Sequence, residues 1–106
     1  MKETQIVSKI IKYINHSPTV DGFAWKNHGG LYGTKGLPDI MAVIRKGEKS
    51  FFLCFEVKTE IGKATEIQKK IIKRFTDLKI MAGVVRSLDE VKELLENLTE
   101  EEFYDD

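Results

Sequence analysis

Hydrophobic residues recur with helical spacing in three segments of the 106-residue chain. Between Glu3 and about Asn15 they are Ile6, Val7, Ile10, Ile11 and Ile14. Between Thr65 and Leu78 they are Ile67, Ile71, Ile72, Phe75 and Leu78, and after Ser87 they are Val91, Leu94, Leu95 and Leu98. Steps of three and four residues place the apolar side chains on one side of a helix, so the pattern predicts three amphipathic helices.

Four shorter segments have the alternating or continuously apolar pattern of strands. They are Phe23 to Asn27, Asp39 to Ile44, Ser50 to Lys58 and Ile80 to Arg86. The turn around Lys46–Glu48 joins the second and third of them, and it is short enough for an antiparallel hairpin. We therefore expect one α/β domain over residues 1–106, in the order α-β-β-β-α-β-α, with a mixed sheet flanked by helices.

The third expected strand carries charged residues at its carboxyl end. Alternation places Phe51, Leu53, Phe55 and Val57 on one face and Phe52, Cys54, Glu56 and Lys58 on the other. Because both faces begin apolar, we expect a central strand that is covered on both sides. Glu56 and Lys58 then emerge from a buried face, where charges need a partner or a purpose. The alternative is that they mark where the strand runs out into water.

Asp39 opens the neighbouring strand, directly after Gly36-Leu37-Pro38. A hairpin can bring it beside Glu56, and two such carboxylates suit Mg²⁺ or Mn²⁺, with the backbone carbonyl of Val57 as a further ligand. Lys58 would orient or activate a water and offset charge on a phosphate. The alternative for Asp39 is a turn-capping residue that follows Pro38.

Two helical polar residues occupy positions in line with the apolar stripes. Gln68 lies in register with Ile71 and Ile72, and Glu3 lies in register with Val7 and other residues of the first stripe. We expect Gln68 to face the Glu56 strand, and we consider Glu3 a further metal ligand. Each residue also has a purely structural explanation that stays open. Gln68 can complete a capping box with Thr65, and Glu3 suits a helix N-terminus.

The net charge of zero conceals a segregated distribution. Residues 26–86 carry 13 Lys and Arg against 6 Asp and Glu, whereas residues 87–106 carry one Lys against nine acids. A basic body with an acidic tail over residues 99–106 suits a nucleic-acid binder, although a solvated surface can also be segregated. The single Cys54 rules out a disulfide framework, and no apolar run reaches the length of a membrane span.

Candidate DNA contacts surround this expected site. The loop 29–36 holds four of the eight glycines, so its backbone can approach phosphates closely, unless it is only a connector. The residues that we assign to DNA binding are Lys26, His28, Tyr32, Thr34, Lys35, Lys63 and Lys69.

Pro38-Asp39, Glu56-Val57-Lys58 and Gln68 together resemble the PD-(D/E)xK nuclease pattern. More narrowly, the chain resembles the stand-alone phage and bacterial type of the virus-type replication–repair nuclease (VRR-NUC) family. The likeness runs from Glu3 to Arg86. It implies a restriction-endonuclease-like fold and a metal-dependent phosphodiesterase site at Asp39, Glu56 and Lys58, with Glu3 and Gln68 in support.

The resemblance further implies a homodimer that cuts branched DNA such as four-way (Holliday) junctions in DNA repair. It also implies a cytoplasmic protein of a bacterial cell or a phage-infected host. Two alternatives remain open. One is a restriction-like or general DNA nuclease that uses the same site, and the other is a DNA-binding module without catalysis.

Overall fold

The computed structural model describes residues 1–28 and 35–98 and has the predicted order of elements. Helix α1 spans Glu3–His16, and strands β1, β2 and β3 span Asp21–Lys26, Ile40–Lys46 and Lys49–Val57. Helix α2 spans Glu66–Asp77, strand β4 spans Met81–Val85 and helix α3 spans Leu88–Glu96. Element ends differ from the sequence prediction by a residue or two, which is the normal uncertainty of such boundaries.

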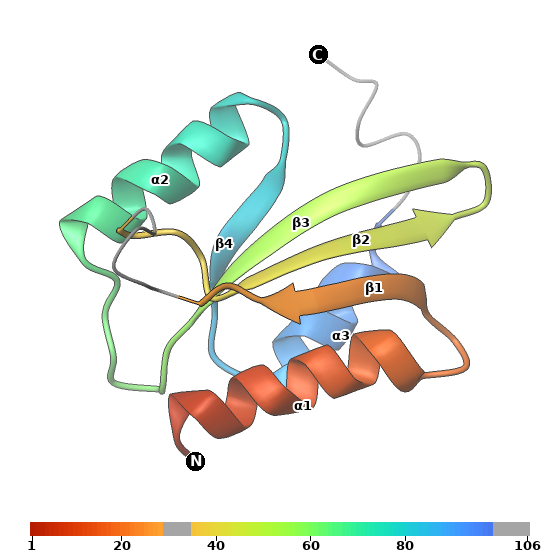
Figure 1. The fold of residues 1–106 in the computed structure, drawn as a ribbon, viewed down its shortest axis with the longest axis horizontal. Coiled ribbons are helices and arrows are strands. Elements are labelled where there is room, and N and C mark those ends of the chain that lie inside the picture. Colours follow the sequence, from red (N-terminus) through yellow and green to blue (C-terminus); the bar gives the residue numbers. More distant parts are fainter. Residues whose placement is uncertain (29–34, 99–106) are drawn as a thin grey trace.

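The four strands form one mixed sheet in the order β1-β2-β3-β4 (Figure 1). Strands β1, β2 and β3 pair antiparallel, and β4 pairs parallel to β3. The parallel pairing needs a crossover connection, and α2 provides it. The predicted mixed sheet and the predicted β2–β3 hairpin are therefore confirmed.

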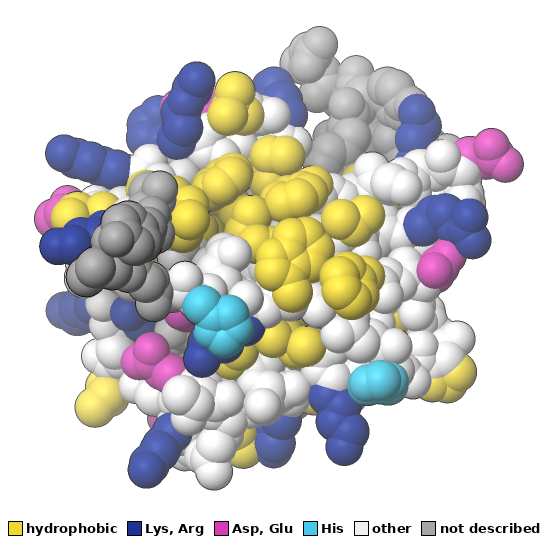
Figure 2. All heavy atoms as spheres, in the orientation of Figure 1, with side chains coloured by type: hydrophobic (Ala, Val, Ile, Leu, Met, Phe, Trp, Pro, Cys, Tyr) yellow, Lys and Arg dark blue, Asp and Glu magenta, His cyan; other side chains and the backbone are white. Residues whose placement is uncertain are grey.

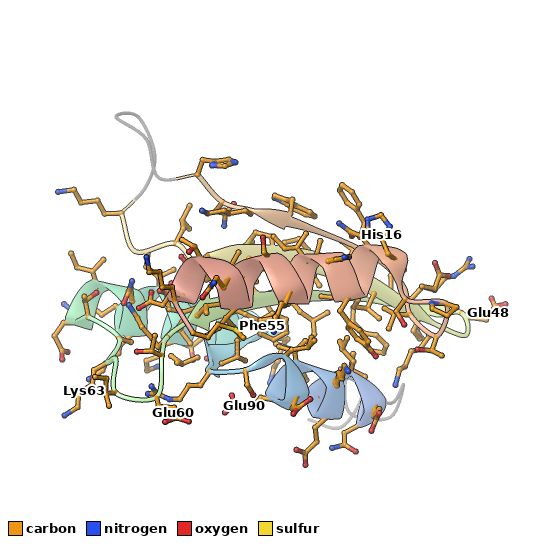
Figure 3. The ribbon with its side chains drawn as sticks, turned by 90° about the horizontal axis from the view of Figure 1, so that it is seen from below. His16, Glu48, Phe55, Glu60, Lys63 and Glu90 are labelled. Atoms are coloured by element: carbon orange, nitrogen blue, oxygen red, sulfur yellow. The ribbon has the colours of Figure 1, made fainter. Side chains whose placement is uncertain are left out.

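Helices α1 and α3 cover one face of the sheet. Their apolar stripes meet the inward residues of the strands, and Figure 3 shows the fully buried Phe55 within this core. The main members of the core are Ile6, Ile10, Ile14, Ile40, Ile44, Phe51, Leu53, Phe55, Val57, Val91 and Leu95. The core therefore lies on the side of the sheet opposite to Glu56, because Phe55 and Val57 alternate with it.

The other face of the sheet is only half covered. Next to β4 and α2 it buries Cys54 and Glu56, but over β1 and β2 Phe23 is 62% exposed and Val43 is 37% exposed. Figure 2 shows a continuous hydrophobic patch over the middle of this face. The prediction that β3 is covered on both faces is thus wrong for its first half, where Phe52 stays partly exposed.

Candidate functional site

Asp39 and Glu56 lie opposite each other on neighbouring strands. Ile40 pairs with Phe55, and one further step along this antiparallel register places Asp39 across from Glu56. Residues opposite each other in an antiparallel pair share a face of the sheet. The Asp39 carboxylate also accepts a hydrogen bond from the backbone N–H of Val57, at 2.8 Å. The hairpin therefore brings together the two carboxylates that the sequence singled out.

Asn27 fixes the backbone on which Asp39 stands. Its amide Nδ2 donates to the carbonyl of Pro38 at 2.7 Å, and its backbone N–H donates to the carbonyl of Asp39 at 2.8 Å. The second bond prolongs the β1–β2 ladder beyond the last assigned pair. Sequence reasoning missed this role because a single Asn at the end of a strand gives no periodic signal.

Lys58 and Gln68 both approach one oxygen of Glu56. The Lys58 ammonium lies 3.5 Å from Oε2, and the Gln68 amide donates to the same atom at 3.0 Å. Gln68 also forms the capping box, with its Oε1 accepting from Thr65 N at 2.8 Å and its own N–H donating to the Thr65 hydroxyl at 3.2 Å. The two interpretations of Gln68 are therefore both realised, because its amide oxygen and nitrogen serve different partners.

The Glu56 carboxyl group is held in an environment that opposes its charge. The residue is 2% exposed, and burial, followed by repulsion from Asp39, raises its pKa from 4.5 to about 7, although Lys58 acts in the opposite direction. Its Oε1 is buried without a hydrogen-bond partner among the described residues. A buried carboxylate oxygen without a donor is costly. This atom is therefore the natural place for a cation.

Glu3 starts helix α1 and is half-buried there. Across residues 1–28 and 35–98, no three Asp, Glu, His or Cys side chains gather closely enough to form a cation cage. Within these residues, the Asp39 and Glu56 pair therefore has no third side chain of this kind beside it. Glu3 as a metal ligand stays a prediction.

The expected DNA-binding residues have different positions. Lys26, His28 and Lys35 are exposed around the start of β2, and Lys69 is exposed on α2, where it pairs with Glu66 at 3.3 Å. Lys63 projects from the turn that precedes α2, as Figure 3 shows. Tyr32, Thr34 and the acidic tail lie outside the described residues. None of the described helices is long and apolar enough to cross a membrane.

Comparison with known proteins identifies the fold. No family model and no curated protein matches the sequence. A solved structure titled "VRR_NUC domain" matches with a TM-score of 0.63 and 22% identity, covering 91% of this chain and 92% of the other. Another, titled "VRR_NUC domain protein", matches with a TM-score of 0.69 and 17% identity, covering 91% and 86%. The chain therefore has the fold of VRR_NUC domains.

Proposed function

We propose that the protein is a divalent-metal-dependent DNA endonuclease that hydrolyses phosphodiester bonds at Asp39, Glu56 and Lys58. The observation that carries the proposal is the buried Glu56 carboxyl group. One of its oxygens has no hydrogen-bond partner among the described residues, and the group lies beside a second carboxylate and an ammonium group. The fold shared with structures titled VRR_NUC domain supports the same function. Fold alone does not determine activity, so the proposal rests on the chemistry of this cluster.

Mg²⁺ or Mn²⁺ fits the chemistry of the donors. Both ions prefer carboxylate and carbonyl oxygens, which Asp39, Glu56 and the backbone of Val57 can offer. Within residues 1–28 and 35–98, no group donates a hydrogen bond to Oε1 of Glu56, which leaves this oxygen available to a cation. Glu3 is proposed as a further ligand that approaches the pair only when the cation binds, because among the described residues it is not gathered with them. When bound, the cation would supply positive charge that polarises a phosphate and acidifies water.

Lys58 is proposed to act on the attacking water and on the phosphate. Its side chain is 13% exposed, so the ammonium group lies in a partly water-excluded site where its field is only weakly screened. There it orients the water and offsets charge that develops on a phosphate oxygen. The Gln68 amide holds Oε2 of Glu56 and leaves Oε1 free. This contact fixes the direction of the carboxylate.

DNA is proposed to approach along the rim of the open face. Lys26, His28 and Lys35 stand beside the Asp39 segment, and Lys63 and Lys69 stand near the start of α2. Tyr32 and Thr34, which lie outside the described residues, are proposed as DNA contacts on the basis of the sequence alone. These groups suit contacts with phosphates, which position a duplex without reading its sequence. Affinity for DNA should therefore fall steeply with salt concentration.

We further propose a homodimer that prefers branched DNA. The half-exposed apolar face of β1 and β2 is larger than a scatter of single residues and suits a protein interface. A two-fold dimer would carry two copies of the Asp39–Glu56 site. Two sites suit paired cuts in a symmetric junction.

A cleavage panel tests the function. Four-way junction, flap, single-stranded and duplex DNA are each incubated with Mg²⁺, with Mn²⁺ and with EDTA. We expect cleavage that needs the metal and favours the junction. Substitutions Asp39→Ala and Lys58→Ala should each lower the rate by about 10²-fold or more. Lys73→Ala is the matched control, because Lys73 is an exposed cation of α2 that pairs with Asp77.

The same panel separates the alternatives. Cleavage of linear duplex at defined sequences, without junction preference, would indicate a restriction-like nuclease. Wild-type binding without cleavage of any substrate, with binding retained in Asp39→Ala, would indicate a DNA-binding module and overturn the proposal.

A further inference from the structure

A short turn links two elements of the proposed site. Strand β3 ends at Val57, Lys58 follows, and residues 59–65 lead to the first turn of α2, which carries Gln68. The turn is closed by a hydrogen bond from Gly62 N–H to the carbonyl of Thr59, at 3.2 Å. Its conformation therefore determines how Lys58 leaves the sheet.

Arg86 holds this turn from the neighbouring strand. Its guanidinium Nη1 donates to the backbone carbonyls of Thr59, Glu60 and Gly62, the last two at 3.3 and 2.7 Å. The backbone of β4 adds a contact just before the turn, since Lys58 N–H donates to the carbonyl of Val85 at 3.0 Å. The end of β4 thus fixes Lys58 and the residues that follow it.

Arg86 itself is fixed at its backbone. Its N–H donates to the Glu90 carboxylate at 2.9 Å, and Glu90 belongs to the first turn of α3, which Ser87 caps. Among the described residues, no carboxylate lies within ion-pair distance of the guanidinium group. Its positive charge is directed instead at three carbonyl oxygens, all of which accept from the single nitrogen Nη1.

We propose that Arg86 is a positioning residue, which sets the place of the Lys58 ammonium by bracing the turn 59–62. This inference rests on the proposed nuclease function of Lys58. A reacting group that is displaced by about 1 Å can lose about 10²-fold in rate. Loosening of the turn should therefore slow the chemical step and leave DNA binding intact.

A direct contact between Arg86 and DNA phosphate is the competing explanation. Arg86 lines a groove of about 710 Å³ together with Lys9, Ile61 and Leu88, so its charge is near the surface. Lys9 shares this groove, and among the described residues no hydrogen bond or ion pair joins its side chain to the turn. Lys9→Gln therefore removes one charge from the same groove and leaves the brace in place, which makes it the matched control.

The experiment compares wild type, Arg86→Lys, Arg86→Gln and Lys9→Gln. Thermal unfolding first verifies that each variant is folded. Three quantities are then measured: the single-turnover cleavage rate at saturating junction DNA, the Kd for that DNA with EDTA, and the hydrogen-exchange rate of the Gly62 amide.

The expected result is a rate at least 10-fold lower in Arg86→Gln, an unchanged Kd and faster exchange at Gly62. Arg86→Lys should fall between wild type and Arg86→Gln, because it keeps the positive charge on a shorter side chain, which brings its ammonium group less close to the carbonyls. Lys9→Gln should cleave like wild type. If the Kd weakens equally in Arg86→Gln and Lys9→Gln while the saturated rate is unchanged, Arg86 only attracts DNA and the inference is overturned.

A wild-type cleavage rate in Arg86→Gln would also overturn the inference that Arg86 positions Lys58. Absence of cleavage by the wild type would instead contradict the proposed function. In that case the exchange rate of the Gly62 amide still tests whether Arg86 braces the turn 59–62. An unchanged rate in Arg86→Gln contradicts the brace, and a faster rate supports it.

Discussion

At the scale of single residues, burial makes the charge of Glu56 energetically unfavourable. Burial and the neighbouring Asp39 raise its pKa from 4.5 to about 7, so the folded protein binds this proton more tightly than the unfolded chain does. The free energy of unfolding must then fall as pH rises through that window. A shift of this size corresponds to about 3 kcal/mol once Glu56 is fully ionised.

Glu56→Gln should therefore stabilise the metal-free protein above pH 7, because a neutral amide has nearly the same shape and carries no charge. We expect a higher melting temperature at pH 8, on the order of 10 °C, and a difference that vanishes near pH 4.5. Thermal unfolding in EDTA across this range measures it. Glu48→Gln, at the exposed hairpin tip in Figure 3, should show no such pH dependence. Parallel pH profiles for wild type and Glu56→Gln would contradict the assignment.

The two functions of Gln68 can be separated by substitution. Gln68→Glu keeps an oxygen for the Thr65 capping box but places a carboxylate where the amide now donates to Glu56. We expect a loss of roughly 1–3 kcal/mol in the metal-free protein at pH 8, and a smaller loss at pH 5. Denaturant unfolding at the two pH values measures it.

Thr65→Ala is the complementary variant. It removes only the cap, so its loss of roughly 1 kcal/mol should be the same at both pH values. If the loss of stability in Gln68→Glu were also the same at both pH values, the charge of Glu56 would not contribute to its contact with residue 68.

At the scale of elements, the loop before Asp39 is pressed against the first turn of α2. Gly36 has a φ of +84°, and a Cβ added there would overlap Ile67 Cγ2. The glycine is therefore required twice, once by its left-handed backbone and once by the approach of the helix. This contact ties the Asp39 segment to the helix that carries Gln68.

Gly36→Ala should destabilise the protein by about 1–3 kcal/mol through both effects. Adding Ile67→Ala should recover the stability that is lost through the overlap with the Ile67 side chain. The loss that comes from the left-handed backbone of residue 36 should remain. A double-mutant cycle of denaturant unfolding measures the coupling between the two sites. Strict additivity of the two losses would show that loop and helix do not press on each other.

The site could be predicted from the sequence where periodicity applies. Alternation along β3 predicted that Glu56 lies on the face opposite to Phe55 and Val57, and the short hairpin was expected to bring Asp39 beside it. The strand register agrees with both expectations. Asn27 and Arg86 could not be found in this way, because each acts through hydrogen bonds to carbonyls that lie far away along the chain. No pattern of apolar and polar positions encodes such bonds.

At the scale of the whole molecule, the uncovered half of the sheet distinguishes its two faces. Phe23, Trp25 and Phe52 form aromatic contacts there, with ring centroids 5.6 and 6.4 Å apart, and the first two remain open to solvent. The opposite face is closed by two helices (Figure 1). A proposed dimer therefore has one obvious apolar face to use.

Val43→Lys should prevent dimer formation, since it places a charge in the centre of this face between Phe23 and Phe52 in the strand register. We expect the variant to sediment as a monomer in analytical ultracentrifugation at micromolar concentration. Thermal unfolding should show that this monomer is folded. Ile61→Lys is the matched control, because Ile61 is 90% exposed but lies in the turn after β3. If the wild type is a dimer and Val43→Lys is a dimer as well, the interface lies elsewhere.

The parallel pairing of β3 with β4 has a consequence for the order in which the chain assembles. The hairpin contacts between β2 and β3 close short loops, whereas Leu53 and Met81 pair across 28 positions of the chain. Long loops close more slowly and are entropically costlier than short ones. The carboxylate pair can thus form within the early hairpins, but the brace on Lys58 must wait for β4. Refolding can be followed by tryptophan fluorescence and by the recovery of cleavage. We expect cleavage to recover only when β4 has joined the sheet.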